Sequence, residues 1–301
     1  MTLSKNAIVT VAGAGLMGRG IAHAFAVSGF ETRLFDINDQ QLDSAKTSIQ
    51  AVLDGGVRIG KLDQSVADTV IKNLSLSTDI SESAIGSDLF IETVSENLSI
   101  KHSVLKDAEK HMSQTGVIGS NTSALSVTEI GTAIADPSRV IGMHFFNPVH
   151  KMKLVEIVLG IATSEQTLVK TREYCDAINK TSIVVNESPG LTTSRMSAMM
   201  GNEAMWMLQE GTASAEDIDT AMRMGFNHPM GPLELGDMTG WDTRLSVLKY
   251  LHSTLGEKFR PCPLIIKMVA AGRYGRKTGH GVYQYNDGKK VPGSGLKASM
   301  I

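Results

Sequence analysis

The first half of the chain alternates short apolar runs with segments of helical periodicity. Runs rich in β-branched residues predict strands, and apolar positions three and four residues apart predict helices. The strands are expected at Ala7–Ala12, Thr32–Phe35, Leu89–Val94, Val117–Ser120, Val140–Phe145, Leu154–Leu159 and Ser182–Val185, and the helices at Leu16–Ser28, Asp39–Leu53, Ser65–Asn73, Ile100–Met112 and Glu165–Ile178. Such alternation is typical of a mostly parallel sheet with helices on both faces.

The pattern changes after Val185, where Asn186–Gly190 gathers residues that break or cap regular structure. From Leu191 to Gly272 the pattern indicates only helices, among them Arg195–Glu210 and one that begins at Ser214. The sequence therefore predicts an α/β domain in residues 1–187, an all-α domain in residues 188–285 and a short polar tail in residues 286–301.

Composition narrows the class of protein. Hydrophobic residues make up 42% of the chain, and the formal charge of −2 gives no positive field for nucleic acid. Two cysteines are too few for a disulfide framework and lack the spacing of a metal site. We expect no metal, no membrane span and no secretory signal, because no apolar run approaches the roughly 20 residues that cross a bilayer. Cytoplasm is the expected location, with an organelle matrix, reached after loss of a presequence, as the alternative.

A glycine motif follows the first expected strand and opens the first expected helix. Its residues are Gly13, Ala14, Gly15, Leu16, Met17 and Gly18. In dinucleotide-binding folds the first glycine makes a tight turn, the second lets the backbone approach the pyrophosphate, and the third allows close packing of helix on strand. The helix N-terminus then offers free N–H groups to the phosphates. This context predicts a Rossmann-type domain. A glycine turn in an unrelated α/β protein is the alternative.

Asp36 lies 23 residues after Gly13, at the end of the second expected strand. A carboxylate there accepts the ribose hydroxyls of adenosine and repels a 2′-phosphate, which favours NAD over NADP. Arg33, three residues earlier, is a contrary signal, since an arginine can hold that phosphate.

His144 and Glu156 each interrupt an apolar strand, and a loop centred on His150 separates the two strands. If the strands pair as an antiparallel hairpin, positions that sum to 300 face each other, and His144 faces Glu156. Opposed side chains have Cβ atoms about 4.5–5.5 Å apart, within reach of a hydrogen bond. A carboxylate so placed fixes the tautomer of an imidazole that acts as a general base.

Six separated motifs together resemble the L-3-hydroxyacyl-CoA dehydrogenases, and the 3-hydroxybutyryl-CoA dehydrogenases of bacteria among them. They are Gly13–Gly18, Ile91–Asn97, Ser120–Ser123, Met143–Pro148 with Met152–Glu156, Asn227–Pro232 and Gly275–Gly279. The resemblance implies NAD as the cofactor and fatty acid metabolism as the context. It also implies reversible oxidation of a 3-hydroxyacyl-CoA to the 3-oxoacyl thioester.

The resemblance also implies a role for each matching residue. His144 removes the proton of the 3-hydroxyl, Glu156 holds His144, and Ser123 hydrogen-bonds the substrate oxygen. Glu96 and Lys101 lie near the cofactor, and Asn147 shapes the loop beside the nicotinamide. Serines such as Ser120 and Ser123 also fill loops and caps routinely, which is the alternative for both.

One position departs from the family pattern. Where the family has an asparagine after its Pro-Gly-Phe turn, this chain has Ser194, which puts the acyl chain length in doubt. The family also binds CoA along a helical excursion, here about Asp39–Leu76, with Arg58 and Lys61 as the cations nearest its tip. Both are equally well read as solvated surface charges.

Three other functions stay open at this point. A non-CoA 3-hydroxy acid or a carnitine-like molecule is an alternative substrate, and an NAD-binding protein without catalysis is an alternative class. A hydrolase triad of Ser123, His144 and Glu156 is disfavoured, because no Gly-x-Ser-x-Gly elbow occurs and the glycine motif would have no purpose. The family's homodimer fits the apolar surface of Arg195–Glu210, so a homodimer through the helical domain is expected.

Overall fold

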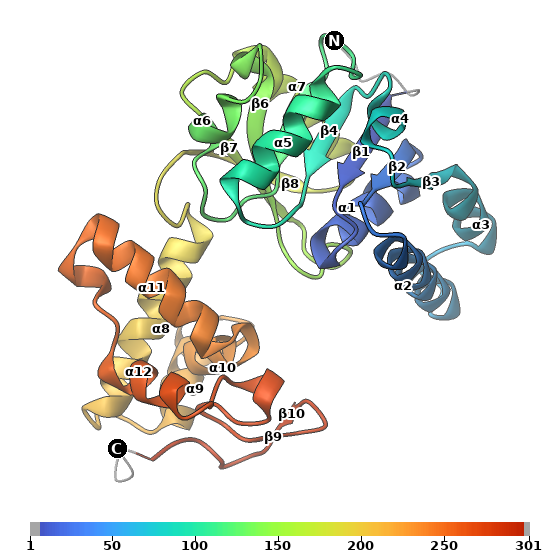
Figure 1. Cartoon of the computed structure of the whole chain (residues 1–301). Helices are drawn as coiled ribbons and strands as arrows, with labels where there is room; N and C mark the ends of the chain where they lie inside the picture. Colours follow the sequence, from blue (N-terminus) through green and yellow to red (C-terminus); the bar gives the residue numbers. More distant parts are fainter. Residues whose placement is uncertain (1–6, 298–301) are drawn as a thin grey trace. The chain divides into compact units, whose positions relative to one another are not determined.

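The computed structural model describes residues 7–297 of the chain. It divides the chain into two compact units, one that ends at Glu187 and one that begins at Ser188 (Figure 1). The boundary falls within the cluster of breakers and caps that follows the last strand of the sheet.

The first unit is built on one eight-stranded sheet. In order across the sheet, the strands are β3 (Leu74–Ser77), β2 (Glu31–Phe35), β1 (Ile8–Ala12), β4 (Leu89–Glu92), β5 (Val117–Ser120), β6 (Val140–Phe145), β7 (Leu154–Leu159) and β8 (Thr181–Asn186). All neighbours pair in parallel except β6 and β7. The expected α/β class with a mostly parallel sheet is confirmed.

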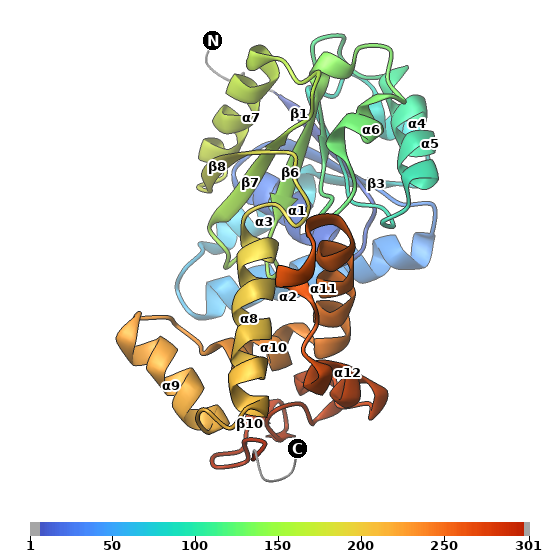
Figure 2. The ribbon, with the colours of Figure 1, turned by 90° about the vertical axis from the view of Figure 1, so that its left-hand side faces the viewer.

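Helices cover both faces of this sheet. They are α1 (Leu16–Val27), α2 (Asp39–Arg58), α3 (Gln64–Asn73), α4 (Ile80–Ala84), α5 (Leu98–Glu109), α6 (Val127–Gly131) and α7 (Glu165–Ala177), with a short 3₁₀ helix at Pro137–Arg139. Phe25 of α1 contacts Tyr174 of α7, so these two helices share one face. Figure 2 shows α4, α5 and α6 on the side of the sheet opposite α7. Buried residues of the strands and of α1 and α7 form one continuous core.

Four elements of this unit were not expected: the edge strand β3, the short helices α4 and α6, and the 3₁₀ helix at Pro137–Arg139. Residues 74–76 were assigned to a helical excursion, but Leu74–Ser77 forms the edge strand β3, and α4 follows it. The alternation of leucine and serine fits a strand, but four residues between two helical segments are too few to establish a period of two. The prediction was wrong at this point, and the excursion reduces to α2 and α3.

The strand order places a ligand crevice at a definite edge. The chain proceeds from β1 to β2 and β3 on one side and to β4 and β5 on the other. In open sheets of this kind, ligands bind outside the carboxyl ends of the strands at the point where the order reverses. That point lies between β1 and β4.

The second unit is helical. Its helices are α8 (Thr193–Gln209), α9 (Ala215–Gly225), α10 (Pro232–Thr239), α11 (Trp241–Leu255) and α12 (Pro263–Ala270), with 3₁₀ helices at Glu257–Phe259 and Arg276–Thr278. Their buried apolar residues form a second core around Trp241. The all-α character of this region is confirmed from Ser188 to the 3₁₀ helix at Arg276–Thr278.

The region expected as a polar tail instead packs onto this unit over its described residues. Strands β9 (Tyr285–Asn286) and β10 (Lys289–Lys290) form a hairpin, and Leu296 is buried in the helical core. The turn residues Asp287 and Gly288 both have positive φ, which is the conformation that an Asp-Gly hairpin turn requires. That dipeptide was the sequence signal that could have predicted the hairpin.

Candidate active site

The glycine turn has the geometry that dinucleotide binding requires. Gly13 has a φ of +99°, and a Cβ atom on Gly18 would lie 1.7 Å from the carbonyl oxygen of Gly13. A Cβ atom on Gly15 would meet nothing within 4 Å, so the backbone there is open to an approaching ligand. No side chain caps α1, whose first residues are Leu16 and Met17. Its first N–H groups therefore suit a phosphate.

Thr93 secures this turn from the next strand of the sheet. Its hydroxyl donates to the carbonyl oxygens of Ala12 and Gly13, each at 2.9 Å. Thr93 is not among the predicted site residues, although it lies within the Ile91–Asn97 motif that carries the resemblance. Its function depends on the pairing of β1 with β4, which the local sequence does not reveal.

Asp36 lies beside the turn and is oriented by backbone donors. The N–H of Ala14 donates to its Oδ2 at 2.8 Å, and the N–H of Asn38 donates to its Oδ1 at 3.0 Å. Arg33 is held elsewhere, by the Glu31 carboxylate and by the carbonyl oxygen of Ile85, each at 2.7 Å. These contacts weaken Arg33 as a ligand for a 2′-phosphate and support NAD.

His144 and Glu156 form the expected pair. The strands β6 and β7 pair with His144 opposite Glu156, and His144 Nδ1 lies 2.7 Å from Glu156 Oε2. The Glu156 side chain is fully buried, and that of His144 is 11% exposed. A carboxylate against Nδ1 favours the tautomer with its proton there, which leaves Nε2 as the proton acceptor. The pairing predicted from the symmetry of the loop is confirmed.

Two residues outside the expected set support β6 beside His144. Asn121 Oδ1 accepts the N–H of Phe145 at 2.9 Å, just where β5 has ended and can no longer pair with β6. The ring centroids of Phe146 and His144 lie 4.7 Å apart. Both contacts restrict the position of the imidazole.

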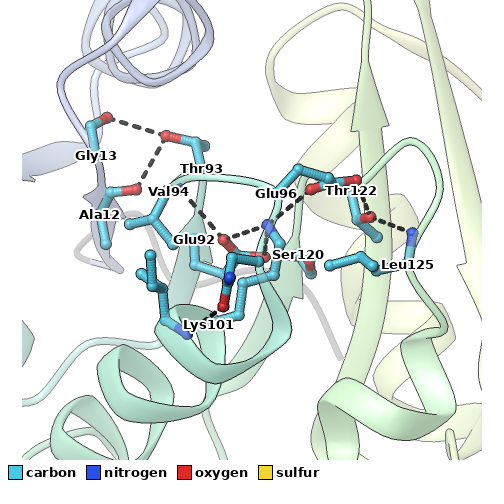
Figure 3. A network of polar contacts seen from close by, with 12 residues as sticks. Ala12, Gly13, Glu92, Thr93, Val94, Glu96, Lys101, Ser120, Thr122 and Leu125 are labelled. Atoms are coloured by element: carbon cyan, nitrogen blue, oxygen red, sulfur yellow. Dashed lines mark hydrogen bonds and ion pairs between the residues drawn. The ribbon is translucent and has the colours of Figure 1, made fainter. Parts of the chain in front are cut away.

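Ser123 lies in an exposed loop that a carboxylate organises. Glu96 Oε1 accepts the N–H groups of Ser123 and Ala124 at 3.1 and 3.2 Å and the Thr122 hydroxyl at 2.5 Å (Figure 3). Although burial acts against it, the hydrogen bond from Thr122 and the charge of Lys101 hold the pKa of Glu96 below its ordinary value. Glu96 is therefore an anion that shapes the loop.

Lys101 is buried, whereas direct contact with a bound cofactor would require an accessible ammonium group. Its side chain is fully buried, and its Nζ donates to both oxygens of Glu92 at 2.8 Å and lies 3.2 Å from Glu96 Oε2. Glu92 is not among the predicted site residues. A glutamate at the end of an apolar strand does not by itself reveal that it is fully buried.

The remaining expected residues lie at separate places. Asn147 is exposed two residues after β6, and its peptide bond to Pro148 is cis. Arg58 ends α2 and Lys61 follows in the next turn, both exposed, so a helix of about 30 Å separates them from the Asp36 end. Ser194 belongs to the second unit, in the first turn of α8.

One row of the sheet register gathers the main groups of the first unit. Phe35, Ala12, Glu92, Ser120 and Gly142 are successive partners across β2, β1, β4, β5 and β6. Asp36, the glycine turn, the Glu96 loop and Ser123 leave the sheet just beyond this row, and His144 lies two residues beyond it on β6. An open phosphate cradle and a carboxylate-held imidazole on one edge define a dinucleotide-dependent oxidoreductase.

Comparison with known proteins gives the family. Residues 8–188 match the family model of the 3-hydroxyacyl-CoA dehydrogenase NAD binding domain. Residues 190–285 match that of the 3-hydroxyacyl-CoA dehydrogenase C-terminal domain. The chain is 41% identical to a probable 3-hydroxybutyryl-CoA dehydrogenase of Bacillus subtilis over 93% of this chain and 97% of that protein. It is 38% identical to 3-hydroxybutyryl-CoA dehydrogenase of Bradyrhizobium diazoefficiens, over 94% and 97% of the two chains.

A solved structure agrees. That of (S)-3-hydroxybutyryl-CoA dehydrogenase from Ralstonia eutropha matches with a TM-score of 0.89 and 39% identity, over 93% of this chain and 99% of that one. This chain belongs to the 3-hydroxyacyl-CoA dehydrogenase family, and its first unit is the family's NAD-binding domain.

Within the described residues, no helix is both long and apolar enough to cross a membrane. No group of three or more His, Cys, Asp or Glu side chains in residues 7–297 could hold a metal ion.

Proposed function

We propose that this protein catalyses the NAD-dependent, reversible oxidation of a short-chain L-3-hydroxyacyl-CoA, such as 3-hydroxybutyryl-CoA, to the 3-oxoacyl-CoA. The observation that carries the proposal is the His144–Glu156 pair on the same strand edge as the glycine turn and Asp36. The names of the relatives supply the substrate class.

The residues of the site divide the reaction between them. Bound NAD would supply the nicotinamide that acts as hydride acceptor for C3 of the substrate. His144 Nε2 accepts the proton of the 3-hydroxyl, while Glu156 on Nδ1 keeps the imidazole in the accepting tautomer and stabilises the charge that it gains. The Ser123 hydroxyl donates to the substrate oxygen. In the reverse direction His144 returns the proton to the oxygen of the 3-oxo group.

The cofactor site fits NAD on grounds of its own. The open backbone at Gly15 and the uncapped start of α1 suit the pyrophosphate, and Asp36 is already oriented by two N–H donors. Glu96 would act from the loop edge, and Lys101 would act through Glu96 because its ammonium group is buried. Asn147, on the loop after β6, would border the nicotinamide.

Substrate handling beyond the reacting carbon rests on the family resemblance. Arg58 and Lys61 are the proposed cations for the CoA moiety, and their exposed positions on the excursion support that role. Ser194 is the proposed substrate-binding residue of the second unit. A homodimer through this unit is proposed as well, supported by the exposed side chains of Met196, Met224 and Phe226, which are 68%, 71% and 73% exposed. A cytoplasmic location stays a prediction.

The test is turnover followed by the absorbance of NADH. We expect acetoacetyl-CoA to drive NADH consumption and free acetoacetate to be inert, with activity declining as the acyl chain lengthens. Equal activity with free acetoacetate would favour a non-CoA substrate. If no 3-oxoacyl thioester supports turnover while NADH still binds, the protein is an NAD-binding protein without this activity.

A further inference from the structure

A chain of three charged side chains links β4 to the start of α5. Glu92 ends β4, Glu96 lies in the following loop, and Lys101 lies in the first turns of α5 (Leu98–Glu109). The Lys101 ammonium contacts both carboxylates, at 2.8 Å to Glu92 and 3.2 Å to Glu96 (Figure 3). This arrangement is a carboxylate–ammonium–carboxylate bridge, and the mechanism above gives roles to Glu96 and Lys101 but none to Glu92.

The Glu92 end fixes the beginning of the loop that carries Ser123. Its Oε1 accepts the Ser120 hydroxyl, and its Oε2 accepts the N–H of Val94 at 3.2 Å. Glu92 and Ser120 are also register partners in β4 and β5, and both are fully buried. Ser120 is the last residue of β5, so Glu92 holds the point where the loop leaves the sheet.

The Glu96 end fixes the other side of the same loop. Its carboxylate accepts from Thr122, Ser123 and Ala124, and the Thr122 hydroxyl in turn accepts the N–H of Leu125 at 2.9 Å. The side chain of Glu96 is 39% exposed, so it could take many other orientations in solvent. The contact with the buried Lys101 ammonium selects the orientation that faces the loop.

Because Lys101 and Glu92 are both fully buried, each depends on the charge of the other. An ammonium in a fully buried site is stable only when acids compensate its charge, and Glu92 is the fully buried acid that does so. Burial raises the pKa of Glu92, while the charge and the hydrogen bond of Lys101 act in the opposite direction and favour the anionic form. Replacing Glu92 by glutamine would leave Lys101 to pair with Glu96 alone and would deprive either the Ser120 hydroxyl or the Val94 N–H of its acceptor.

We propose that Glu92 is a positioning residue that, through Lys101, Glu96 and Ser120, clamps the Ser120–Ala124 loop at both ends and so places Ser123 for the substrate. This inference rests on the proposed function for the role of Ser123. The position of the loop itself is independent of that function, and it can be measured without substrate.

The test compares Glu92→Gln with a matched control, Glu109→Gln. Glu109 is the last residue of α5, about 12 Å along the helix from Lys101, and it pairs with Arg139 at 3.1 Å away from the loop. Hydrogen exchange of the amides of residues 121–125 is measured in each variant without ligand. Thermal unfolding and turnover of acetoacetyl-CoA with NADH are measured alongside.

We expect Glu92→Gln to speed exchange in residues 121–125 about tenfold or more and to lower kcat by about 10–100-fold, the usual effect of a displaced positioning group. Glu109→Gln should lose thermal stability but keep wild-type exchange in this loop and wild-type kcat. If Glu92→Gln matches the control in loop exchange, or keeps the kcat of the control, the proposal is overturned. If the wild type turns over no acyl thioester, the proposed function fails, and loop exchange alone then decides whether Glu92 clamps the loop.

A second variant keeps the test decisive if Glu92→Gln unfolds. The double change Glu92→Gln with Lys101→Met removes both buried charges, and such neutral pairs commonly restore stability. We expect the double variant to fold, yet to retain fast exchange in residues 121–125, because Glu96 has lost the ammonium that orients it. Slow, wild-type exchange in this folded variant would overturn the proposal.

Discussion

Both units bury carboxylates completely, but they satisfy them in different ways. In the first unit, Glu156 faces the imidazole of His144, and Glu92 faces the ammonium of Lys101. In the second, Asp237 accepts from the indole N–H of Trp241 and from the N–H groups of Val282 and Tyr283. In the first unit each carboxylate therefore contacts a basic side chain, an imidazole or an ammonium group. In the second, Asp237 accepts hydrogen bonds from neutral indole and backbone N–H groups.

The nature of the partner, and not burial, separates the acids of the active site from the structural acids in this protein. Burial raises the pKa of Asp237 and also that of Asp219, so a raised pKa alone does not mark a site. A glycine in each family motif of the second unit packs directly against one of these two residues. A Cβ atom on Gly231 would lie 2.2 Å from the Asp219 side chain, and one on Gly275 would lie 2.2 Å from the carbonyl oxygen of Asp237. Part of the resemblance to the family is therefore carried by residues that hold the fold.

The largest effect should come from the base of the first unit. We expect His144→Ala to lower kcat by about 10²–10⁴-fold, the usual contribution of a general acid–base group, while NADH still binds. NADH binding is measured by fluorescence and turnover by NADH absorbance. Near-wild-type turnover would place His144 among the structural residues and would break the comparison.

Asp36 is an intermediate case between the two kinds of acid. Backbone N–H groups donate to it, as they do to Asp237, but it is only half-buried and so stays open to a ligand. We expect Asp36→Ala to weaken binding of NADH about tenfold, roughly 1.4 kcal/mol, and to relax discrimination against NADPH. The measurement is the KM for each nucleotide. An unchanged preference for NADH over NADPH would remove Asp36 from the ribose site.

The last effect is on stability and not on activity, and it concerns a half-buried histidine with no acid beside it. Burial, with the nearby His150 and Lys180, lowers the pKa of His23 to about 4, and its Nδ1 has no hydrogen-bond partner among residues 7–297. The unfolded chain binds the proton first, so stability falls as pH drops from about 6.5 towards 4 and the loss is complete below that. We expect His23→Leu to reduce this loss by about 1–3 kcal/mol, measured by urea unfolding at pH 7, 5 and 4. An identical pH dependence in both proteins would contradict the assignment.

The sequence predicts best what depends on local pattern. The loop centred on His150 sets the register of β6 and β7, and that register alone brings His144 to Glu156. The glycine turn is likewise local, since its strand, turn and helix are consecutive. The roles of Thr93 and Asn121 could not be predicted, because each depends on which strands become neighbours in the sheet.

The bridge of Glu92, Lys101 and Glu96 shows the same limit. The spacing from Glu92 to Lys101 is visible in the sequence, but their burial depends on the packing of α5 against β4. Strand β3 was not predicted because its four residues are too few to show a strand pattern, and its pairing with β2 is not visible in the local sequence. The hairpin at Asp287 and Gly288 was predictable, since an Asp-Gly pair is its own signal.

The most direct measurement compares Glu156→Gln with Asp237→Asn. Each change replaces one oxygen of a buried carboxylate by an amide nitrogen and removes the negative charge. Turnover of acetoacetyl-CoA is measured per folded molecule, beside thermal unfolding. We predict that Glu156→Gln lowers turnover by about 10²-fold or more with the smaller loss of Tm, since the carboxylate stabilises the charged imidazole. We predict that Asp237→Asn loses about 2–4 kcal/mol of stability but retains wild-type turnover when folded. Wild-type turnover in Glu156→Gln would contradict the account.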